Sequence, residues 1–337
     1  MYELFNYKII VVNKINVGVT GIGSLIGQAI IKSIQRSDLN DKINIIGFDY
    51  FKDTVGGFWI DEKYILPDIL NPEVNHNVWL DVIVKLIIER NIKLLFVGVD
   101  FELPIFAKYK EEIQRITGAT VMVSTLGVVE IADDKFLTYE FLNNNGLLHP
   151  RSYLPGQVDY DSLIYPVIIK PRKGARSIGV HKVEDKSNLL RVIEDVKEPV
   201  IQECVGVDTD EFTCGTIYLN DELKKIIVLR RSLKEGNTFI SHYSKDFPEI
   251  ITTYLKEVTQ CLKPFGACNF QLRLDENGTP KIFEINSRHS GTTYIRSLFG
   301  YKEIEYIINL LLFNKEIEFD LREGTVVRYF DEFYIEK

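Results

Sequence analysis

Residues 16–125 alternate short apolar runs with amphipathic segments, and this alternation restricts the fold more than any other feature. Each run is apolar throughout, as expected for a strand that is covered on both faces. The segments between the runs have helical length and periodicity. The pattern predicts βαβ units that build a parallel sheet. The predicted strands are 16–21, 43–49, 93–100 and 120–124, and the predicted helices are 25–36, 77–91 and 102–116.

After residue 125 the pattern changes to paired strands mixed with helices. A helix is predicted over 133–146, with Asp133 as its cap and Gly146 at its end. Asn220-Asp221 and Asn277-Gly278 indicate hairpin turns. The fold class is therefore α/β in the first part and α+β in the second. The further predicted strands are 165–171, 177–183, 198–205 and the hairpin 210–231, the further helices are 186–196, 247–263 and 301–313, and 314–337 carries no predicted element.

The composition excludes several classes of partner. The 337 residues have a formal charge of -8, and 45% of them are hydrophobic. Such a chain builds a full core, and its negative charge argues against a nucleic-acid face, which needs clustered Lys and Arg. No apolar run approaches the ~20 residues of a membrane span, and the first residues do not have the pattern of a signal peptide. The four cysteines have no CxxC spacing, so we expect a reducing, cytoplasmic setting.

The segment 268–286 predicts a hairpin with one polar and one apolar face. If the turn is symmetric about Asn277-Gly278, alternation places the side chains on two faces. The predicted polar face is Asn269, Gln271, Glu284 and Asn286, and the predicted apolar face is Phe270, Leu272, Phe283 and Ile285. Oxygen ligands held close together suit Mg²⁺. A solvated polar face of an antiparallel sheet is an equally good interpretation of these four residues alone.

Two other stretches have the residue types of a phosphate or nucleotide site. A strand ends in Lys170 and is followed by a loop with two glycines, a serine and further cations, where backbone N–H groups could cradle phosphate. The spacing is not that of a Walker loop, and a basic surface turn is the alternative. In 200–215 a strand ends in Glu203 and the next begins with Glu211, so the bend between them could pair with an adenine edge. Alternatively, Glu211 forms a cross-strand ion pair with Arg230.

The order of these stretches resembles the ATP-grasp superfamily, and most closely the half-units of the carbamoyl-phosphate synthase large subunit. The matching stretches are Asp134-Lys135, 168–180, 202–213 and the strand pair 269–288. The resemblance covers about 16–313 and implies a Rossmann-like pre-ATP-grasp domain followed by a two-lobed ATP-grasp domain. The implied divisions are the pre-ATP-grasp domain at 1–125, a small lobe with a glycine-rich lid at 126–205, a large lobe with the metal site at 206–315, and a tail at 316–337.

The resemblance also implies a role for individual residues. It places Lys135 and Lys170 on the ATP phosphates beneath a lid, 172–179, that includes Ser177 and Gly179. It places Glu203 beside the adenine amino group, the Cys204-Val205 backbone at the hinge, and Glu211 at the ribose. The implied ligands of one or two Mg²⁺ ions, or of Mn²⁺, are Gln271, Glu284 and Asn286. Arg288 would steady the γ-phosphate or an acyl phosphate, and Arg231 would be a further phosphate or substrate cation.

The activity implied by the resemblance is that of an ATP- and Mg²⁺-dependent ligase. Such an enzyme converts a carboxylate into an acyl phosphate, which an amine attacks to form an amide. The partners are then small molecules, and a homodimer is compatible with the resemblance. A single-half carbamoyl-phosphate-synthase-like subunit that works with another polypeptide is the alternative, and an ATP-binding module without ligase chemistry is a further one.

The turn at 19–28 invites a different interpretation, an NAD(P)-dependent oxidoreductase. Gly21, Gly23 and Gly27 follow a strand and open a helix, and Asp49 ends the next strand. The spacing is GxGxxxG rather than GxGxxG, and a tight strand–helix turn explains it equally. At the next strand end, Asp100 and Glu102 either face the same cleft or cap the following helix, and 290–292 are candidates for an acceptor pocket.

Overall fold

The computed structural model describes residues 14–174, 176–207 and 209–336. The expectation about a signal peptide concerns mainly residues 1–13, which lie outside the described residues. Among the helices of the described residues, none is both long enough and apolar enough to cross a membrane.

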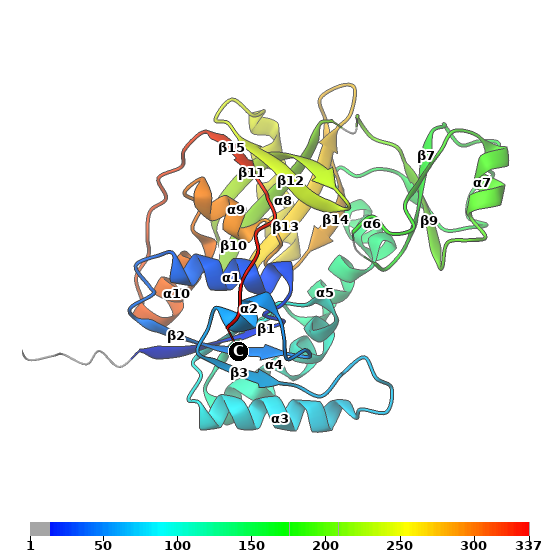
Figure 1. The fold of residues 1–337 in the computed structure, drawn as a ribbon. Coiled ribbons are helices and arrows are strands. Elements are labelled where there is room, and N and C mark those ends of the chain that lie inside the picture. The colour runs from blue at the N-terminus through cyan, green and yellow to red at the C-terminus, as the bar shows by residue number, and fades with distance from the viewer. Residues whose placement is uncertain (1–13, 175, 208, 337) are drawn as a thin grey trace, which may run out of the picture.

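The first sheet is parallel throughout, in the order β3-β2-β1-β4-β5, as predicted (Figure 1). Its strands are β1 (Ile15–Thr20), β2 (Ile43–Asp49), β3 (Glu62–Ile65), β4 (Leu94–Phe96) and β5 (Thr120–Met122). Its helices are α1 (Leu25–Gln35), α2 (Val55–Phe58), α3 (His76–Glu89) and α4 (Leu103–Thr117), with the 3-10 turn η1 (Asp100–Glu102) before α4. The sequence does not predict β3, because this edge strand is partly exposed and lacks an apolar run.

The second sheet is small and antiparallel, in the order β6-β9-β7-β8. It consists of β6 (Ser152–Tyr153), β7 (Val167–Pro171), β8 (His181–Val183) and β9 (Pro199–Glu203), with helix α7 (Lys186–Val192). The predicted strand 177–183 is wrong in its first half. Arg176 and Ser177 have φ values of 58° and 56° and form a turn instead.

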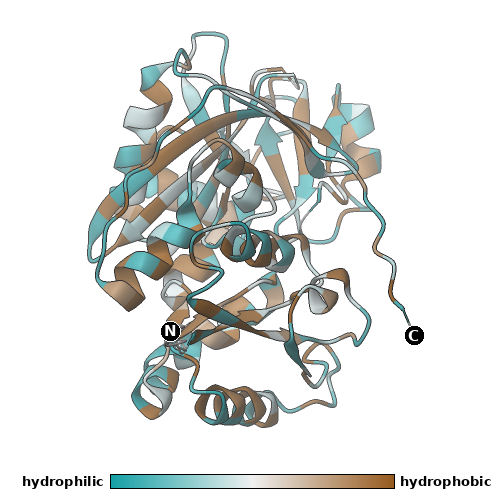
Figure 2. Cartoon of the chain, turned by 60° about the vertical axis from the view of Figure 1, so that its left-hand side comes forward, coloured by the Kyte–Doolittle hydropathy of each residue, from teal (hydrophilic) through white to brown (hydrophobic). Residues whose placement is uncertain are grey.

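The third sheet has six antiparallel strands in the order β14-β13-β10-β11-β12-β15. They are β10 (Glu211–Leu219), β11 (Glu222–Lys234), β12 (Asn237–Tyr243), β13 (Gly266–Leu274), β14 (Pro280–Asn286) and β15 (Gly324–Val327). The helices after β12 are α8 (Glu249–Leu262), α9 (Thr293–Leu298) and α10 (Glu303–Phe313). The tail, which carries no predicted element, thus supplies the edge strand β15, and the residues after it run along the outside of the molecule (Figure 2).

The helix predicted over 133–146 is α6 (Lys135–Asn144), and a further helix that the sequence does not predict, α5 (Leu126–Asp133), comes directly before it. The cap is Asp134 rather than Asp133, because Asp134 has an extended backbone and its side chain accepts hydrogen bonds from the backbone N–H groups of Phe136 and Leu137. The break between α5 and α6 places Lys135 at the start of α6.

Strands β13 and β14 pair in the predicted register where the polar residues lie. The observed pairs include Asn269 with Asn286, Gln271 with Glu284, and Leu272 with Ile282. The turn is centred on Asn277 and closed by a hydrogen bond from Asp275 N–H to the Thr279 carbonyl (2.9 Å). A bulge then adds one residue to β14 and restores the predicted pairs. The placement of Phe283 on the apolar face is therefore wrong: Ile282 is in the core, and Phe283 faces a cavity.

A second bulge changes the partner of Glu211. The register of β10 against β11 shifts between Ile217 and Tyr218, so Glu211 lies opposite Arg231 rather than Arg230. The predicted ion pair with Arg230 is wrong for this reason.

The parallel sheet and the six-stranded sheet share one apolar core. Ile30 and Ile34 of α1 belong to the same buried cluster as Ile295 of α9 and Ile307 of α10. Figure 1 shows α1 between the two sheets. The small sheet has a cluster of its own, which includes Ile169.

A buried ion pair holds α9 and α10 together. Arg296 Nη1 lies 3.2 Å from Glu303 Oε2, and both side chains are 0% exposed. Arg296 also donates to Asn269 of β13. The ion pair therefore links helices α9 and α10 to β13, the strand that carries Gln271.

We predict that Arg296→Met lowers the free energy of unfolding by about 3–5 kcal/mol, because it leaves the Glu303 charge buried without its partner. Urea unfolding followed by circular dichroism measures this. The control is Arg322→Met, which removes the pair with Asp320 (3.5 Å) that is mostly exposed, and it should cost less than about 1 kcal/mol. Equal effects of the two variants would contradict the assigned importance of the buried pair.

Candidate functional site

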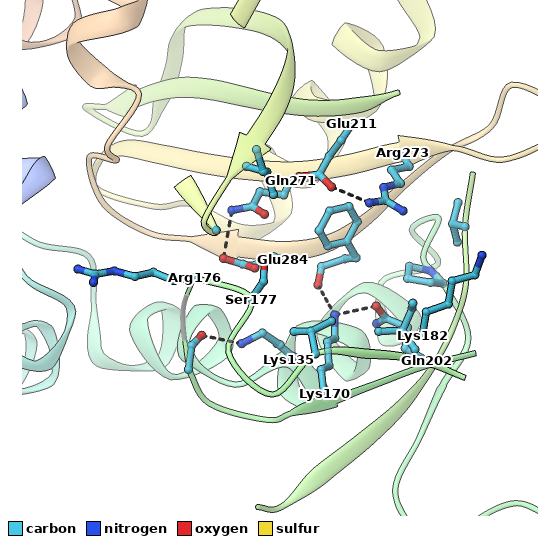
Figure 3. A pocket seen from close by; sticks show the side chains of 18 of the residues that line it. Lys135, Lys170, Arg176, Ser177, Lys182, Gln202, Glu211, Gln271, Arg273 and Glu284 are labelled. Carbon is cyan, nitrogen blue, oxygen red and sulfur yellow. Dashed lines mark hydrogen bonds and ion pairs between the residues drawn. The ribbon is translucent and has the colours of Figure 1, made fainter. Parts of the chain in front are cut away.

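A cavity of about 330 Å³ lies between the small sheet and the six-stranded sheet (Figure 3). Most of the residues predicted for the site line it. They are Lys135, Lys170, Ser177, Glu203, Val205, Glu211, Arg231, Gln271 and Glu284. Asn286 and Arg288 line a second cavity of about 130 Å³, and Lys135, Gly174 and Glu284 belong to both. Gly179 and Cys204 are next to lining residues but do not line either cavity themselves.

Lys170 is a buried cation at the base of the larger cavity. Its Nζ donates to Gln202 Oε1 (2.7 Å) and to the Phe283 carbonyl (3.1 Å), and its side chain lies near the Phe283 ring. Neither partner is charged. Burial, together with repulsion by Lys135, lowers the pKa of Lys170 to about 7. An anionic ligand beside Lys170 would therefore favour its protonated, positively charged form.

Residues on either side of position 175 line the cavity, and contacts hold them at both sides. Lys135 Nζ donates to the Gly174 carbonyl (2.9 Å), and Arg172 pairs with Asp134 (2.6 Å). On the other side these residues meet the turn between β11 and β12. A Cβ at Gly236 would lie 2.3 Å from the Arg176 carbonyl oxygen, so only glycine allows this approach.

Glu211 is held between two arginines at the cavity wall. Its carboxylate accepts from Arg231 Nη2 (2.7 Å) and Nε (2.9 Å), and its other oxygen accepts from Arg273 Nη2 (2.8 Å). Arg231 also donates to Gln271 Oε1 (2.7 Å). Arg231 therefore connects Glu211 with the polar face of the β13–β14 pair.

The three residues predicted to bind metal converge on one carboxylate oxygen. Gln271 Nε2 (3.1 Å) and Asn286 Nδ2 (2.9 Å) both donate to Glu284 Oε1. The amide oxygens accept from Arg231 and Arg288. In the described residues no group of three or more His, Cys, Asp or Glu could hold a metal. The predicted ligand set is not such a group, because Gln271 and Asn286 are amides.

One carboxylate and two amide oxygens fit Mg²⁺, which takes few protein ligands and completes its shell with water and phosphate. In the present arrangement the two amide NH₂ groups donate hydrogen bonds to Glu284 where a cation would otherwise bind. A cation would need both amides to turn their oxygens toward it. The donor set therefore fits the predicted metal.

Glu203 lies at the outer end of the cavity and is tied to the protein. It pairs with Lys281 (2.8 Å) and Arg151 (3.8 Å) and accepts from the Arg151 backbone N–H (2.9 Å). Partial burial alone would raise its pKa, but the hydrogen bond from Lys281 and the other contacts lower the pKa below its ordinary value. Glu203 remains ionised at neutral pH.

Arg288 follows β14 and points into the second cavity. Its guanidinium pairs with Asp100 Oδ1 (2.6 Å) and donates to Asn286 Oδ1 (2.9 Å) and to the His289 carbonyl (3.1 Å). Asp100 thus faces the cleft, which settles one of the two alternatives left by the sequence. Glu102 does not face it: its buried carboxylate accepts from Thr20 and Tyr50. Of the proposed acceptor residues 290–292, none lines either cavity.

The glycine turn before α1 packs tightly on its own domain. Asp49, which would face a ribose in a dinucleotide site, accepts from the Gly23 backbone N–H (2.7 Å) and from the N–H of Tyr50 (2.7 Å). A Cβ at Gly23 would lie 2.7 Å from Thr54, and one at Gly27 would lie 2.2 Å from the Gly21 carbonyl. These glycines therefore serve strand–helix packing, the alternative to an NAD(P) site.

Among the lining residues absent from the sequence-based prediction are Gln202, Arg273 and Phe283. The sequence could have indicated Gln202, because a polar residue in a buried strand needs a hydrogen-bond partner. Arg273 lies two residues after Gln271 and shares its face. No pattern in the sequence indicates Phe283, because only the bulge turns it toward the cavity.

Residues 132–292 match a family model described as an ATP-grasp domain. Two relatives are a D-alanine–D-alanine ligase of Polaromonas naphthalenivorans, 28% identical over 44% of this chain and 45% of that protein, and a carbamoyl-phosphate synthase of Methanobrevibacter smithii, 27% identical over 59% and 57%. The chain thus spans about half the length of these relatives. The solved structure of an N5-carboxyaminoimidazole ribonucleotide synthetase in complex with ADP aligns with a TM-score of 0.73 and 14% identity, over 91% of this chain and 79% of that one. The chain contains an ATP-grasp domain, and its fold, with the N-terminal parallel sheet, is that of ATP-grasp ligases.

We predict that the affinity for Mg-ATP falls as pH rises above about 7, because Lys170 must be protonated to face phosphate. The Kd should rise by up to about tenfold per pH unit, with proton uptake on binding. Isothermal titration calorimetry in two buffers of different ionisation enthalpy measures both.

Lys170→Met should remove the proton uptake, whereas Lys186→Met, at the exposed pair with Asp161, should retain it. A proton uptake that survives in Lys170→Met would show that another group titrates.

Proposed function

We propose that this protein is an ATP- and Mg²⁺-dependent ligase that activates a carboxylate as an acyl phosphate and joins it to an amine as an amide. We call the three proposed metal ligands, Gln271, Glu284 and Asn286, the metal-type group. One observation supports the proposal most: Glu284, the carboxylate of this group, lies where the two cavities meet. The larger cavity has the size and the cations for a nucleotide. The smaller one then holds the group that receives the phosphoryl.

On the nucleotide side, the chain supplies positive charge and a lid. Lys135, Lys170 and Arg231 neutralise the triphosphate, which is the main requirement of phosphoryl transfer. Gln271, Glu284 and Asn286 hold Mg²⁺, which when bound neutralises phosphate oxygens. Ser177 and Gly179 belong to the lid over the phosphates, which excludes water from the acyl phosphate.

The base and sugar are assigned to the outer end of the cavity. Glu203, with the backbone at Cys204 and Val205, faces the adenine amino group. Glu211 takes the ribose. The contacts with two arginines fix the position of the Glu211 carboxylate. A ribose hydroxyl would donate a further hydrogen bond to this carboxylate.

On the acceptor side, Arg288 orients the carboxylate. A carboxylate oxygen attacks the γ-phosphorus, the bond to the ADP oxygen breaks, and an acyl phosphate forms. The amine nitrogen then attacks the acyl carbon, phosphate leaves, and the amine proton passes to solvent. No side chain forms a covalent bond, so positioning and charge carry the reaction.

The domain division 1–125, 126–205, 206–315 and 316–337 is part of this proposal, as are small-molecule substrates and a cytoplasmic setting. The cysteines at 204, 214, 261 and 268 form no disulfide among the described residues, which agrees with a reducing compartment. A second candidate, a half-unit that works with another polypeptide as in carbamoyl-phosphate synthase, is supported by the match to about half of one such enzyme. Activity of the isolated chain with a single carboxylate and amine separates the two.

We predict that Glu284→Ala lowers ADP release at least ~1000-fold, because metal stabilisation of the transferring group is worth several kcal/mol. A coupled ADP assay with a panel of carboxylates and amines measures this, and circular dichroism checks the fold. Glu276→Ala, on the exposed turn of the same hairpin, is the matched control and should keep full activity. Unchanged turnover in Glu284→Ala would rule out the metal assignment.

A further inference from the structure

The smaller cavity carries information about the substrate that the comparisons do not. Its volume of about 130 Å³ is well below the ~300 Å³ at which pockets for drug-sized ligands begin. It joins the metal-type group through Glu284 and Asn286, so its occupant lies where the phosphoryl is received. The occupant is therefore a small molecule.

Asp100 and Arg288, two of the charged residues that line this cavity, are paired with each other. Asp100 comes from the end of β4 and Arg288 from the end of β14, and their Nε–Oδ1 distance is 2.6 Å. The Asp100 side chain is 51% exposed, whereas that of Arg288 is 12% exposed. Because the Asp100 carboxylate is half exposed, water screens this pair. A ligand with both charges can therefore replace it at little cost.

The cavity is also lined by Asp133, Lys135, Glu284 and Asn286, and the remaining side chains are apolar apart from one hydroxyl. Leu103 and Val129, from α4 and α5, line the cavity and are buried. Ser287 also lines it, is 2% exposed, and its Oγ has no hydrogen-bond partner among the described residues. A buried hydroxyl without a partner is a group for a polar ligand to satisfy. The cavity thus places a small apolar wall beside the Asp100–Arg288 pair and the buried Ser287 hydroxyl.

We propose that the carboxylate substrate is an α-amino acid with a small apolar side chain. Its carboxylate pairs with Arg288 beside the metal-type group, its ammonium group pairs with Asp100, and its side chain packs on Leu103 and Val129. The zwitterion replaces one internal ion pair with two, so every charge stays paired. This assignment rests on the proposed ligase function and names its substrate class.

Other carboxylates fit the charges less well. A simple monocarboxylate that takes Arg288 leaves Asp100 without its partner. Bicarbonate does the same and has no group for the apolar wall. A dicarboxylate meets repulsion from Asp100 and from Asp133, which also lines the cavity. The ammonium group is therefore the feature that this cavity selects.

The first experiment traps the acyl phosphate with hydroxylamine in the presence of Mg-ATP. Alanine, propionate and bicarbonate are the test acids, and ADP and hydroxamate are both measured. The inference expects ADP release and hydroxamate with alanine at least about tenfold above propionate, the loss expected for one charged hydrogen bond. Equal rates with propionate, or ADP release with bicarbonate alone, would overturn it.

The second experiment uses Asp100→Asn, with Asp161→Asn at the exposed pair with Lys186 as the matched control. Asp100→Asn should raise the KM for alanine about tenfold or more and abolish the preference over propionate, while the Mg-ATP affinity stays the same. The control should change none of these. A preference that survives in Asp100→Asn would contradict the role of Asp100.

Thermal shift separates this inference from the function on which it rests. Stabilisation by a non-hydrolysable Mg-ATP analogue, with further stabilisation by alanine, supports both. A response to the analogue without a response to alanine overturns the amino-acid assignment alone. The absence of any response to the analogue overturns the ligase proposal and this inference with it.

Discussion

The buried ion pair between Arg296 and Glu303 underlies much of the arrangement described above. Burial alone would raise the pKa of Glu303, but Arg296 and His289 lower it to about 2, so the carboxylate stays charged inside the core. The pair reaches β13 through Asn269. It also requires a glycine on β10, since a Cβ at Gly215 would lie 2.7 Å from the Arg296 guanidinium carbon. Because a half-removed buried pair is strongly unfavourable, this network holds α9, α10 and the central strands in one arrangement.

That arrangement sets the floor of the site. Asn269 lies opposite Asn286, and Arg288 and His289 follow directly on β14. His289 pairs with Glu303 (3.1 Å) and packs edge-on against Phe96 of the parallel sheet, with ring centroids 5.3 Å apart. The same segment therefore touches the metal-type group, the buried pair and the N-terminal sheet. The distance between Arg288 and Asp100 depends on all three contacts.

Several charged groups in the two cavities have partners within the protein. Glu211 has two arginines, Arg288 has Asp100, and Glu284 has two amide groups. Lys170 donates hydrogen bonds to two neutral groups, the Gln202 side chain and the Phe283 carbonyl, and its pKa is lowered to about 7. A nucleotide and a metal would exchange these internal partners for ligand groups. The site is thus organised before binding, and only Lys170 changes its charge state when an anion arrives.

The sequence by itself determined the order of the elements, the parallel sheet and the pairs Gln271–Glu284 and Asn269–Asn286, because apolar periodicity and turn residues act over short range. The structure forms these pairs for a reason that the sequence does not reveal. The turn is centred on Asn277 rather than between Asn277 and Gly278, and a bulge in β14 restores the predicted register. Only the tertiary structure decided that Phe283 faces the cavity, that Glu211 meets Arg231, and that Asp100 meets Arg288. These outcomes depend on bulges and on contacts between residues far apart in the chain, which packing of the whole core fixes and which no local pattern encodes.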